Sequence, residues 1–328
     1  MNASIPARNK RPVFVLGSPR SGTTLLYHML LSSGNFAIYR TESNVFNLLV
    51  PRFGDLSDPR HKQELMKVWL KSKLYERSGL DAADIEKKVM AECRNGGDFL
   101  RIVMGEVCRR QNVERWADCT PDHLLYLDQI KRTIPEALVI HIVRDGRDVA
   151  LSLEKQGWIR PFPWDKNNSV LVAGLYWEWI VNHGRENGRA WGADYTEVHF
   201  EDLITNPRPT LAKLGEFIQH DLDYDRIQSV GVGSVSDPNT SFKSGAGFNP
   251  VGRWRSQFSP EALAQFESLM GSTLQGLGYD LATQNTSRNG HHLSGRRAAY
   301  QAVYGGKLWL KRNTPLGRWL ISDDLSWL

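Results

Sequence analysis

The sequence predicts an α/β protein in which helices flank a mostly parallel central sheet, with a helical cap inserted after the first strand–helix unit and a C-terminal extension. Residues 12–17 (PVFVLG), 137–143 (ALVIHIV) and 195–200 (YTEVHF) are short runs rich in β-branched and aromatic side chains, a pattern typical of strands. Each run is followed by a segment whose apolar residues recur at helical spacing. Such alternation is typical of a parallel sheet covered on both faces.

The strand–helix units follow one another with one long insertion. Residues 58–115 look almost wholly helical, with an apolar stripe that includes Leu65, Trp69 and Leu74, and we expect them to cap the carboxyl edge of the sheet. The helix after the third strand begins with prolines, which favour the first turn of a helix. The helices predicted after the three strands are 23–31, 144–155 and 207–219.

Length and composition indicate a globular protein of one large domain or two modest ones. The 328 residues suffice for a hydrophobic core, and 41% hydrophobic with 23% charged residues exclude wholesale disorder. The longest nearly uninterrupted apolar stretch, 170–181, has twelve residues and contains Glu178, whereas a membrane-spanning helix needs about 20 apolar residues. We therefore expect no transmembrane segment.

The net charge of +5 resides at the C-terminal end. From Arg288 onward the chain has seven basic and two acidic residues, and the remainder has 34 of each. Recognition of a duplex normally needs a broad basic face, so we expect no nucleic-acid partner. A neutral body can still bind a small polyanion in a local pocket.

The N-terminus and the cysteines indicate the cellular compartment. Residues 1–11 lack a signal-type apolar core, and we expect them to form a flexible N-terminal segment. Cys93, Cys108 and Cys119 have no metal-ligand spacing and cannot pair completely, which favours buried thiols in a reducing compartment. These features predict a cytoplasmic protein, and no cluster of His, Cys or carboxylate residues predicts a metal site.

The C-terminal extension, 285–328, begins with a polar stretch at 285–295 that resembles a flexible linker. Beyond it, basic and aromatic residues are mixed, and Gly305–Gly306 is expected to interrupt any continuous amphipathic helix. We favour packing of the aromatic residues on the main domain, with a peripheral membrane contact as the alternative. The aromatic residues are Tyr300, Tyr304, Trp309, Trp319 and Trp327.

Residues 17–24 (GSPRSGTT) have the GxxxxG spacing of a phosphate-binding loop between a strand and a helix. Backbone N–H groups and the helix dipole can surround an anion there. Thr23 stands where an ATP-binding loop has lysine, and Arg20 lies inside the loop instead. The permanently charged guanidinium of Arg20 suits an oxygen that gains charge during group transfer. Because the loop also lacks an obvious acidic metal ligand, it favours a nucleotide handled without magnesium.

A second anion site is predicted after the second strand. Arg144 follows the strand directly, and Ser152 lies eight residues later, about two helical turns on. Open α/β sheets bind ligands in the crevice beyond the carboxyl ends of their strands, where these two side chains can bracket a further phosphate. Two anion sites imply a bis-phosphorylated nucleotide.

Four segments together resemble the sulfotransferases that use 3′-phosphoadenosine 5′-phosphosulfate (PAPS). The resemblance spans residues 12–279 and is greatest to the bacterial and tyrosylprotein-type branch, which has arginine rather than lysine in the loop. It implies a P-loop NTPase-like fold, with a sulfotransferase domain at 12–284 and the helical cap inserted in it. The segments are VLGSPRSGTTLL (15–26), HIVRDGRDVALSL (141–153), VHFEDL (198–203) and GRWR (252–255).

The resemblance implies a donor, PAPS, and a product, 3′-phosphoadenosine 5′-phosphate (PAP). It assigns Arg144 and Ser152 to the 3′-phosphate, with Arg253 as a further basic residue near the same phosphate. Phe200 takes the place of a tyrosine near the adenine, where aromatic stacking is retained. The residues implied in binding the 5′-phosphosulfate are Arg20, Ser21, Gly22, Thr23 and Thr24.

Sulfuryl transfer also needs a base that takes the proton of the acceptor. Glu42, in YRTESNVF (39–46), resembles the glutamate base of the tyrosylprotein branch after a shift of one residue. His123, in CTPDHLLYL (119–127), competes because other branches use a histidine in a comparable segment and its ordinary pKa lies near neutrality. Relatives often have lysine where this chain has Cys119. Arg20, Glu42 and His123 are therefore the candidate catalytic residues.

These observations predict an enzyme that moves a sulfuryl group in line from PAPS to a hydroxyl, or less favourably an amine. The acceptor is a small molecule, a lipid, a glycan or a peptide. Two alternatives stay open. One is a nucleotide kinase with a divergent phosphate loop, which Thr23 disfavours, and the other is a non-catalytic protein that binds adenosine bisphosphate.

Overall fold

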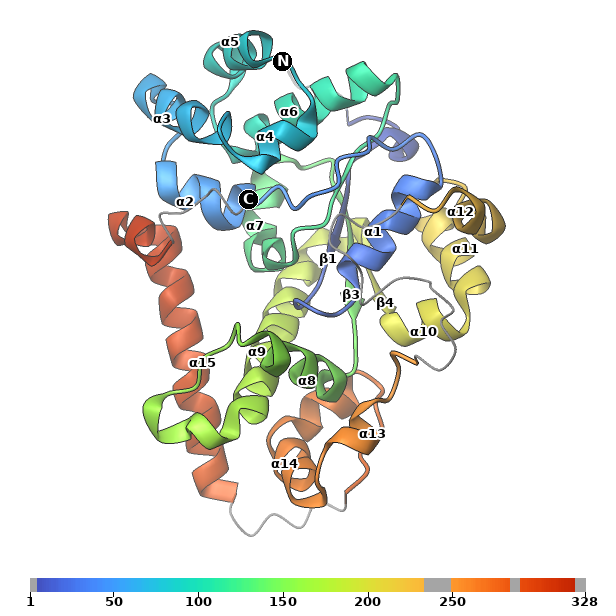
Figure 1. Cartoon of the computed structure of the whole chain (residues 1–328), viewed down its shortest axis with the longest axis vertical. Coiled ribbons are helices and arrows are strands. Elements are labelled where there is room, and N and C mark those ends of the chain that lie inside the picture. The colour runs from blue at the N-terminus through green and yellow to red at the C-terminus, as the bar shows by residue number, and fades with distance from the viewer. Residues whose placement is uncertain (1–4, 233–248, 284–289, 322–328) are drawn as a thin grey trace.

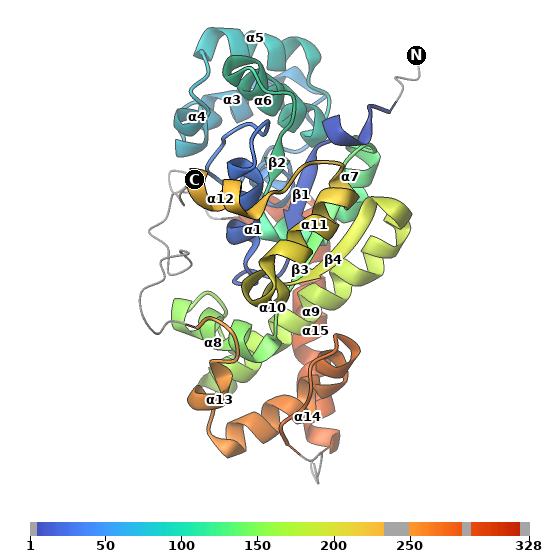
Figure 2. The same ribbon diagram turned by 90° about the vertical axis from the view of Figure 1, so that its right-hand side faces the viewer.

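A four-stranded parallel sheet with the order β2-β1-β3-β4 lies at the centre of the molecule, flanked by helices (Figures 1 and 2). The computed structural model describes residues 5–232, 249–283 and 290–321, so residues 285–289 of the predicted linker and Trp327 lie outside the described residues. The strands are β1 (Val13–Leu16), β2 (Ala117–Asp118), β3 (Leu138–Val143) and β4 (Tyr195–His199). The predicted α/β class with a mostly parallel sheet is confirmed.

Strands β1 and β3 are buried along their whole length and pair in parallel from Val13↔Leu138 to Leu16↔His141. The β-branched residues that predict these strands suit this environment, because they pack well on a pleated surface. A Cβ atom at Gly17 would lie 2.5 Å from the carbonyl oxygen of Ile142, so glycine is needed where the chain leaves β1. As a result, the segments that follow β1 and β3 begin side by side at one edge of the sheet.

The helices predicted after the three strands are all present, within about two residues of the predicted bounds. Helix α8 is capped by Asp145, whose carboxylate accepts a hydrogen bond from the backbone N–H of Arg147. Strand β2 has only two residues and shows no strand pattern in the sequence. The helices are α1 (Thr23–Ser32), α2 (Val50–Phe53), α3 (Pro59–Trp69), α4 (Lys73–Ser78), α5 (Ala82–Glu92), α6 (Gly96–Gln111), α7 (Leu127–Thr133), α8 (Gly146–Gln156), α9 (Ser169–Gly188), α10 (Phe200–Thr205), α11 (Pro207–Ile218), α12 (Tyr224–Val230), α13 (Trp254–Gln257), α14 (Pro260–Gly276) and α15 (Gly290–Asn313).

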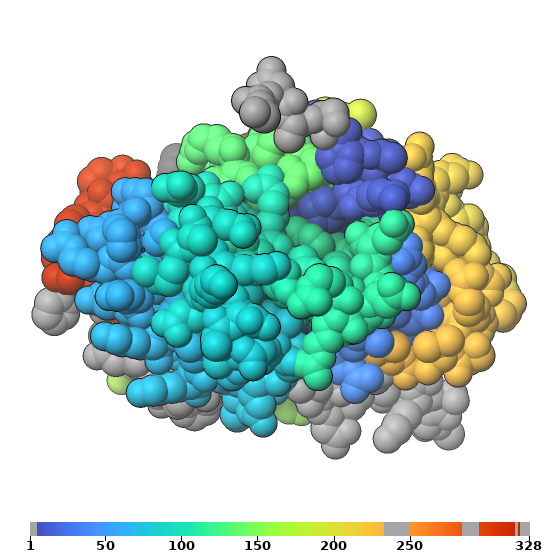
Figure 3. Space-filling view, turned by 90° about the horizontal axis from the view of Figure 1, so that it is seen from above, coloured from blue at the N-terminus to red at the C-terminus, as the bar shows by residue number. Residues whose placement is uncertain are grey.

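The inserted segment 58–115 is helical, as predicted, but it does not cover the carboxyl edge of the sheet. Its helices α3 to α6 lie toward the opposite end of the molecule from α8 and α14 (Figures 1 and 2), and they form much of the face seen in Figure 3. Leu65 and Trp69 belong to one buried cluster with Phe14 and Leu16 of β1. The predicted placement is therefore wrong, because the apolar stripe packs in the core beside one face of the sheet.

The prediction of a flexible N-terminal segment is wrong for residues 5–11. Arg8 and Arg11 both pair with Asp194, at 2.9 and 2.7 Å. The buried guanidinium of Arg115 donates hydrogen bonds to the carbonyl oxygens of Arg8 and Arg11. Three arginines and one aspartate thus anchor the chain where it enters β1.

Helix α15 packs along α9 and runs through Gly305 and Gly306 without interruption. Tyr300 accepts a hydrogen bond from the backbone N–H of Phe162, and Tyr304 meets Tyr176 edge to face, with ring centroids 5.3 Å apart. The predicted break at the glycine pair is wrong, because these contacts outweigh a cost of about 1 kcal/mol per glycine. The predicted linker is wrong for residues 290–295, which already belong to α15.

Other sequence-based expectations concern the cysteines and the membrane. Cys93, Cys108 and Cys119 are buried and unpaired, as predicted. None of the helices in the described ranges combines the length and the apolar character that crossing a bilayer requires. Tyr300 is buried against the domain, whereas Trp309 is 59% exposed, so the aromatic residues of the extension pack on the domain only in part.

A buried ionic network fastens α8 to the middle of α14 and to the segment that follows α14. The guanidinium of Arg147 pairs with Asp145 at 2.8 Å and with Glu267 at 2.6 Å, and it lies 3.7 Å from the ring centroid of Trp254. Glu267 in turn accepts backbone hydrogen bonds from Ala282 and Thr283. Removal of one member of a buried pair leaves the other charge without compensation.

We expect Arg147→Leu to lower the free energy of unfolding by about 3–5 kcal/mol, because Glu267 and Asp145 lose their buried cation. Urea denaturation of the purified variant measures this loss. Arg208→Leu, which breaks an exposed pair with Asp225, is the matched control and should leave the midpoint unchanged. Equal midpoints for both variants would contradict a stabilising role for the network.

Candidate functional site

The loop between β1 and α1 has the backbone geometry of an anion cradle. Arg20 and Gly22 adopt left-handed conformations, with φ of 71° and 99°. No side chain caps the N-terminus of α1, so its first N–H groups are left to bind an anion. A Cβ atom at Gly22 would lie 2.4 Å from the ring of Phe200, which explains why glycine is needed there.

The two predicted anion sites lie in contact at the carboxyl edge of the sheet. Nε of Arg20 donates to Oγ of Ser152 at 3.0 Å, and Nη1 of Arg144 donates to the carbonyl oxygen of Arg20 at 3.0 Å. The guanidinium of Arg144 also lies over the ring of Phe200, 4.3 Å from its centroid. The phosphate loop, the turn after β3 and the ring of Phe200 therefore form one continuous surface.

Positive charge is concentrated around Arg144. Burial lowers the pKa of Arg144, Asp148 and Glu201 oppose this shift, and repulsion from Arg253 and Arg20 adds to it. Arg253 is brought close because Asp148 accepts the backbone N–H groups of Gly252 and Trp254, at 2.8 and 2.9 Å. Neighbouring arginines that repel one another are the arrangement expected of a site for a polyanion.

A cavity of about 330 Å³ joins this charged surface to the segment that holds Glu42. Its lining comes from the phosphate loop, the turn after β3, the 3₁₀ helix η3 (Pro121–Tyr126), the connection between α8 and α9, and α9 itself. The lining residues are Pro19, Arg20, Gly22, Thr23, Thr24, Glu42, Pro121, Asp122, Arg144, Leu153, Trp158, Ile159, Tyr176 and Phe200.

Glu42 lines the same cavity, and its charged neighbours are carboxylates. Burial raises the pKa of Glu42 to about 8, and repulsion from Asp122 and Asp118 adds to the shift. A carboxyl group with so high a pKa is a stronger proton acceptor than an ordinary glutamate.

His123 lies behind this segment, and it does not line the cavity. Its side chain is fully buried, with Nδ1 2.9 Å from Asp118 and Nε2 accepting the backbone N–H of Phe46 at 3.1 Å. Thr120, bonded to the same aspartate, accepts the backbone N–H of Asn44 at 3.2 Å. Asp118, Thr120 and His123 therefore hold the backbone on the C-terminal side of Glu42.

Most of the residues singled out in the sequence line this cavity, and four do not: Ser21, His123, Ser152 and Arg253. Ser21 is buried and its N–H donates to the carbonyl oxygen of Ser18 at 3.0 Å, while Ser152 is held beside the lining by its hydrogen bond from Arg20. Sequence reasoning missed Asp122, Trp158 and Tyr176, which come from separate segments and share no local motif. Among the described residues, no group of three His, Cys or carboxylate side chains is placed to hold a metal ion.

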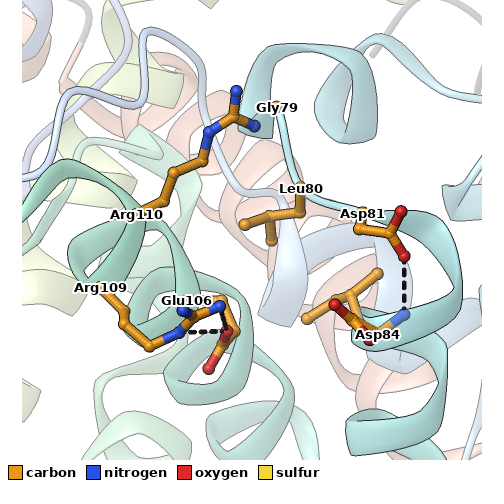
Figure 4. Close-up of a pocket in the computed structure, with 8 residues that line it drawn as sticks. Gly79, Leu80, Asp81, Asp84, Glu106, Arg109 and Arg110 are labelled. Atoms are coloured by element: carbon orange, nitrogen blue, oxygen red, sulfur yellow. Dashed lines mark hydrogen bonds and ion pairs between the residues drawn. The ribbon is translucent and has the colours of Figure 1, made fainter.

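A second hollow, of about 470 Å³, lies on the inserted helices rather than at the sheet (Figure 4). Its lining includes Asp81, Glu106, Arg109 and Arg110, and Arg109 is already paired with Glu106 at 2.8 Å. Neither of the two phosphate segments contributes to it. We therefore place the candidate site in the cavity at the carboxyl edge.

Comparison with solved structures identifies the same fold in sulfotransferase domains. The sulfotransferase domain of the Synechococcus PCC 7002 olefin synthase matches with a TM-score of 0.56 and 22% identity, over 86% of this chain and 100% of that one. The sulfotransferase domain from the curacin biosynthetic pathway matches with a TM-score of 0.52 and 18% identity, over 82% and 98%. A search of curated proteins found no match.

The structural similarities show only the fold, whereas a match to a family model assigns the chain to a family. The model described as "Sulfotransferase family" matches residues 12–225, which include the phosphate loop, Glu42, Arg144 and Phe200. The match covers more than half of the 328 residues. The chain therefore belongs to the sulfotransferase family.

Proposed function

We propose that this protein transfers the sulfuryl group of PAPS to a hydroxyl of an acceptor, with PAP as the second product. The observation that carries the proposal is that Arg20, Arg144 and Glu42, from separate segments of the chain, line one cavity. The charge of the two arginines suits a bis-phosphorylated donor, and Glu42 offers a proton acceptor.

The residues around Arg20 and Arg144 fit the two phosphate groups of such a donor. Nε of Arg144 is buried and has no hydrogen-bond partner among the described residues, as expected of a group that completes its bonding with an anion. The N-terminus of α1 and Arg20 would bind the 5′-phosphosulfate, and Arg144 with Ser152 the 3′-phosphate. Phe200, between Gly22 and Arg144, offers an aromatic face to the adenine.

In the reaction, the bond between sulfur and the phosphate oxygen breaks and a bond between sulfur and the acceptor oxygen forms. Arg20 would stabilise the charge that develops on the leaving phosphate oxygen, because a fixed guanidinium in a partly desolvated site needs little reorganisation. Glu42 would take the proton of the acceptor hydroxyl. Glu42 is half-buried, and the reduced hydration of its charged form makes it a stronger proton acceptor.

Of the two candidate bases, the geometry favours Glu42. Both nitrogens of His123 already have partners, and the ring lies outside the cavity, so His123 acts as a positioning residue for the Glu42 segment. We also propose a cytoplasmic location, because three unpaired buried thiols suit a reducing compartment.

The first prediction separates the two arginines. Arg20→Ala should lower kcat for sulfate transfer by about 10²–10³, because it removes a donor aimed at developing charge. Arg144→Ala should instead raise the Kd for PAP by about 30-fold or more, because it removes a buried charged contact. Steady-state transfer of labelled sulfate and calorimetric titration with PAP measure the two effects.

Arg255→Ala is the matched control for the arginine variants. Arg255 stacks on Trp254 near the cavity but outside its lining, so both its kcat and its Kd for PAP should match the unmodified protein. The reverse pattern, with PAP affinity lost in Arg20→Ala and kcat lost in Arg144→Ala, would contradict the roles of the two arginines. Normal PAP binding without transfer to any alcohol, phenol, sugar, lipid or peptide would indicate a non-catalytic binder.

The second prediction concerns pH. Because Glu42 must be deprotonated to accept a proton and its pKa is raised to about 8, kcat/KM should rise about tenfold per pH unit below 8 and level off above it. The groups that face Glu42 are Asp122 and Asp118, which raise its pKa further. A pH–rate profile of the free enzyme measures this limb.

Glu42→Gln should lower kcat/KM by about 10²–10⁴ and remove the rising limb. His123→Asn should lower the rate while the limb near pH 8 remains, because Glu42 is still present. Glu261→Gln, on the exposed first turn of α14, is the control for loss of a carboxylate. An active Glu42→Gln enzyme with an unchanged profile would transfer the role of base to another group.

A further inference from the structure

A tryptophan lies at the opening of the cavity, beside Arg20. Of the lining residues that the structure describes, only Trp158 is exposed, at 57%, and the others are buried or half-buried. The centroid of its ring lies 5.9 Å from the guanidinium carbon of Arg20. Because Trp158 both lines the cavity and contacts solvent, it forms part of the rim, next to the arginine of the phosphate loop.

The local backbone explains why a large aromatic side chain is exposed at this position. Helix α8 ends at Gln156, and Gly157 follows with a φ of 65°, its N–H donating to the carbonyl oxygen of Glu154 at 2.9 Å. A glycine in this left-handed conformation ends a helix and turns the chain away from the helix axis. Trp158 comes directly after this turn, and the turn therefore brings it to the rim.

The other end of the connection between α8 and α9 is held by the C-terminal helix. Tyr300 of α15 accepts the backbone N–H of Phe162 at 3.0 Å, and the two rings stack with their centroids 4.7 Å apart. The buried Asp165 pairs with Arg296 of the same helix at 3.3 Å. Only three residues separate Trp158 from Phe162, so this anchorage limits how far the indole can move.

An apolar wall at this point matters for the proposed chemistry, because water is itself an acceptor. The oxygen of a water molecule can attack the sulfur, and the sulfur–oxygen bond to the phosphate then breaks. One proton of the water passes to Glu42 and the other to solvent, and sulfate and PAP are the products. Arg20 and Glu42 assist this reaction as they assist transfer to a hydroxyl. Exclusion of water from the sulfuryl group is what prevents such a side reaction.

We propose, on the basis of the proposed function, that Trp158 determines the choice between the acceptor and water. Its indole covers the opening beside Arg20, where the donor presents its sulfuryl group, and α15 holds it there through Tyr300. The face of the ring packs against the carbon skeleton of an acceptor but is a poor partner for a water molecule. The ring also reduces hydration around Arg20, which strengthens the attraction between its guanidinium and the leaving oxygen.

The test does not depend on the identity of the acceptor, because PAPS and water are the only reactants. With PAPS labelled in its sulfuryl group and no acceptor present, Trp158→Ala should release inorganic sulfate about tenfold faster than the unmodified protein. Trp158→Phe, which keeps an aromatic ring, should stay near the unmodified rate. Calorimetric titration with PAP shows whether each variant still binds the nucleotide.

Trp309→Ala is the matched control, because Trp309 is exposed to a similar extent, 59%, and does not line the cavity. It should leave the release of sulfate unchanged. Glu42→Gln, added to Trp158→Ala, should suppress the gain, because the water that reacts inside the cavity then has no base. A gain that survives Glu42→Gln would contradict hydrolysis in this site.

Tyr300 is a positioning residue for Trp158, and a double-mutant cycle tests this role. Tyr300→Leu should raise the release of sulfate by a smaller factor than Trp158→Ala does. In the Trp158→Ala background it should add nothing further, because Tyr300 acts through Trp158. A full effect of Tyr300→Leu in that background would overturn the positioning role.

Release of sulfate from Trp158→Ala at the rate of the unmodified protein, with normal binding of PAP, would overturn the inference. An equal gain in Trp309→Ala would overturn it as well, because the effect would then not be specific to the opening of the cavity. Failure of the proposed function has a different signature, in which PAP does not stabilise the unmodified protein against heat and no labelled sulfate leaves PAPS for any acceptor.

Discussion

The parallel pairing of β1 with β3 is the constraint on which the site depends. Because the two strands end at the same edge and Gly17 allows contact with the carbonyl of Ile142, the phosphate loop and the turn after β3 start side by side. Arg144 can then donate to the carbonyl oxygen of Arg20, while Arg20 reaches Ser152. The register of these two strands therefore brings together two anion-binding motifs that lie more than 100 residues apart in sequence, and the two motifs form one surface.

The cavity beside this surface is lined by groups of opposite charge. Burial lowers the pKa of Arg20 and of Arg144, and burial with neighbouring carboxylates raises the pKa of Glu42. Each of these groups therefore disfavours its own charged state and is stabilised when a partner of opposite charge, or a proton, arrives. The anionic donor and the proton-releasing acceptor that we propose meet both requirements.

The charged residues of the cavity could be found in the sequence because their signals are local. A GxxxxG loop after a strand, and an arginine after the next strand, mark positions whose geometry follows from a few neighbouring residues. Asp122, Tyr176 and Trp158, which also line the cavity, were missed because they come from η3, α9 and the connection before α9. The apolar stripe in residues 58–115 predicted the helices correctly but not their position. Amphipathicity shows that one face of a helix is buried, but it does not show which part of the protein covers that face.

The contrast between local sequence signals and contacts between distant segments also explains why the C-terminal helix α15 matters for the cavity. The family model ends at residue 225, so the shared part of the chain contains Arg20, Arg144 and Glu42 but not α15. Helix α15 is nevertheless fixed to η3, which lines the cavity, because Arg312 pairs with Asp128 and donates to the carbonyl oxygen of Leu125 in η3. Tyr304 of the same helix packs against Tyr176, which also lines the cavity. Part of the cavity wall is thus supported by a segment outside the family match, and such segments are where proteins of one fold acquire different specificities.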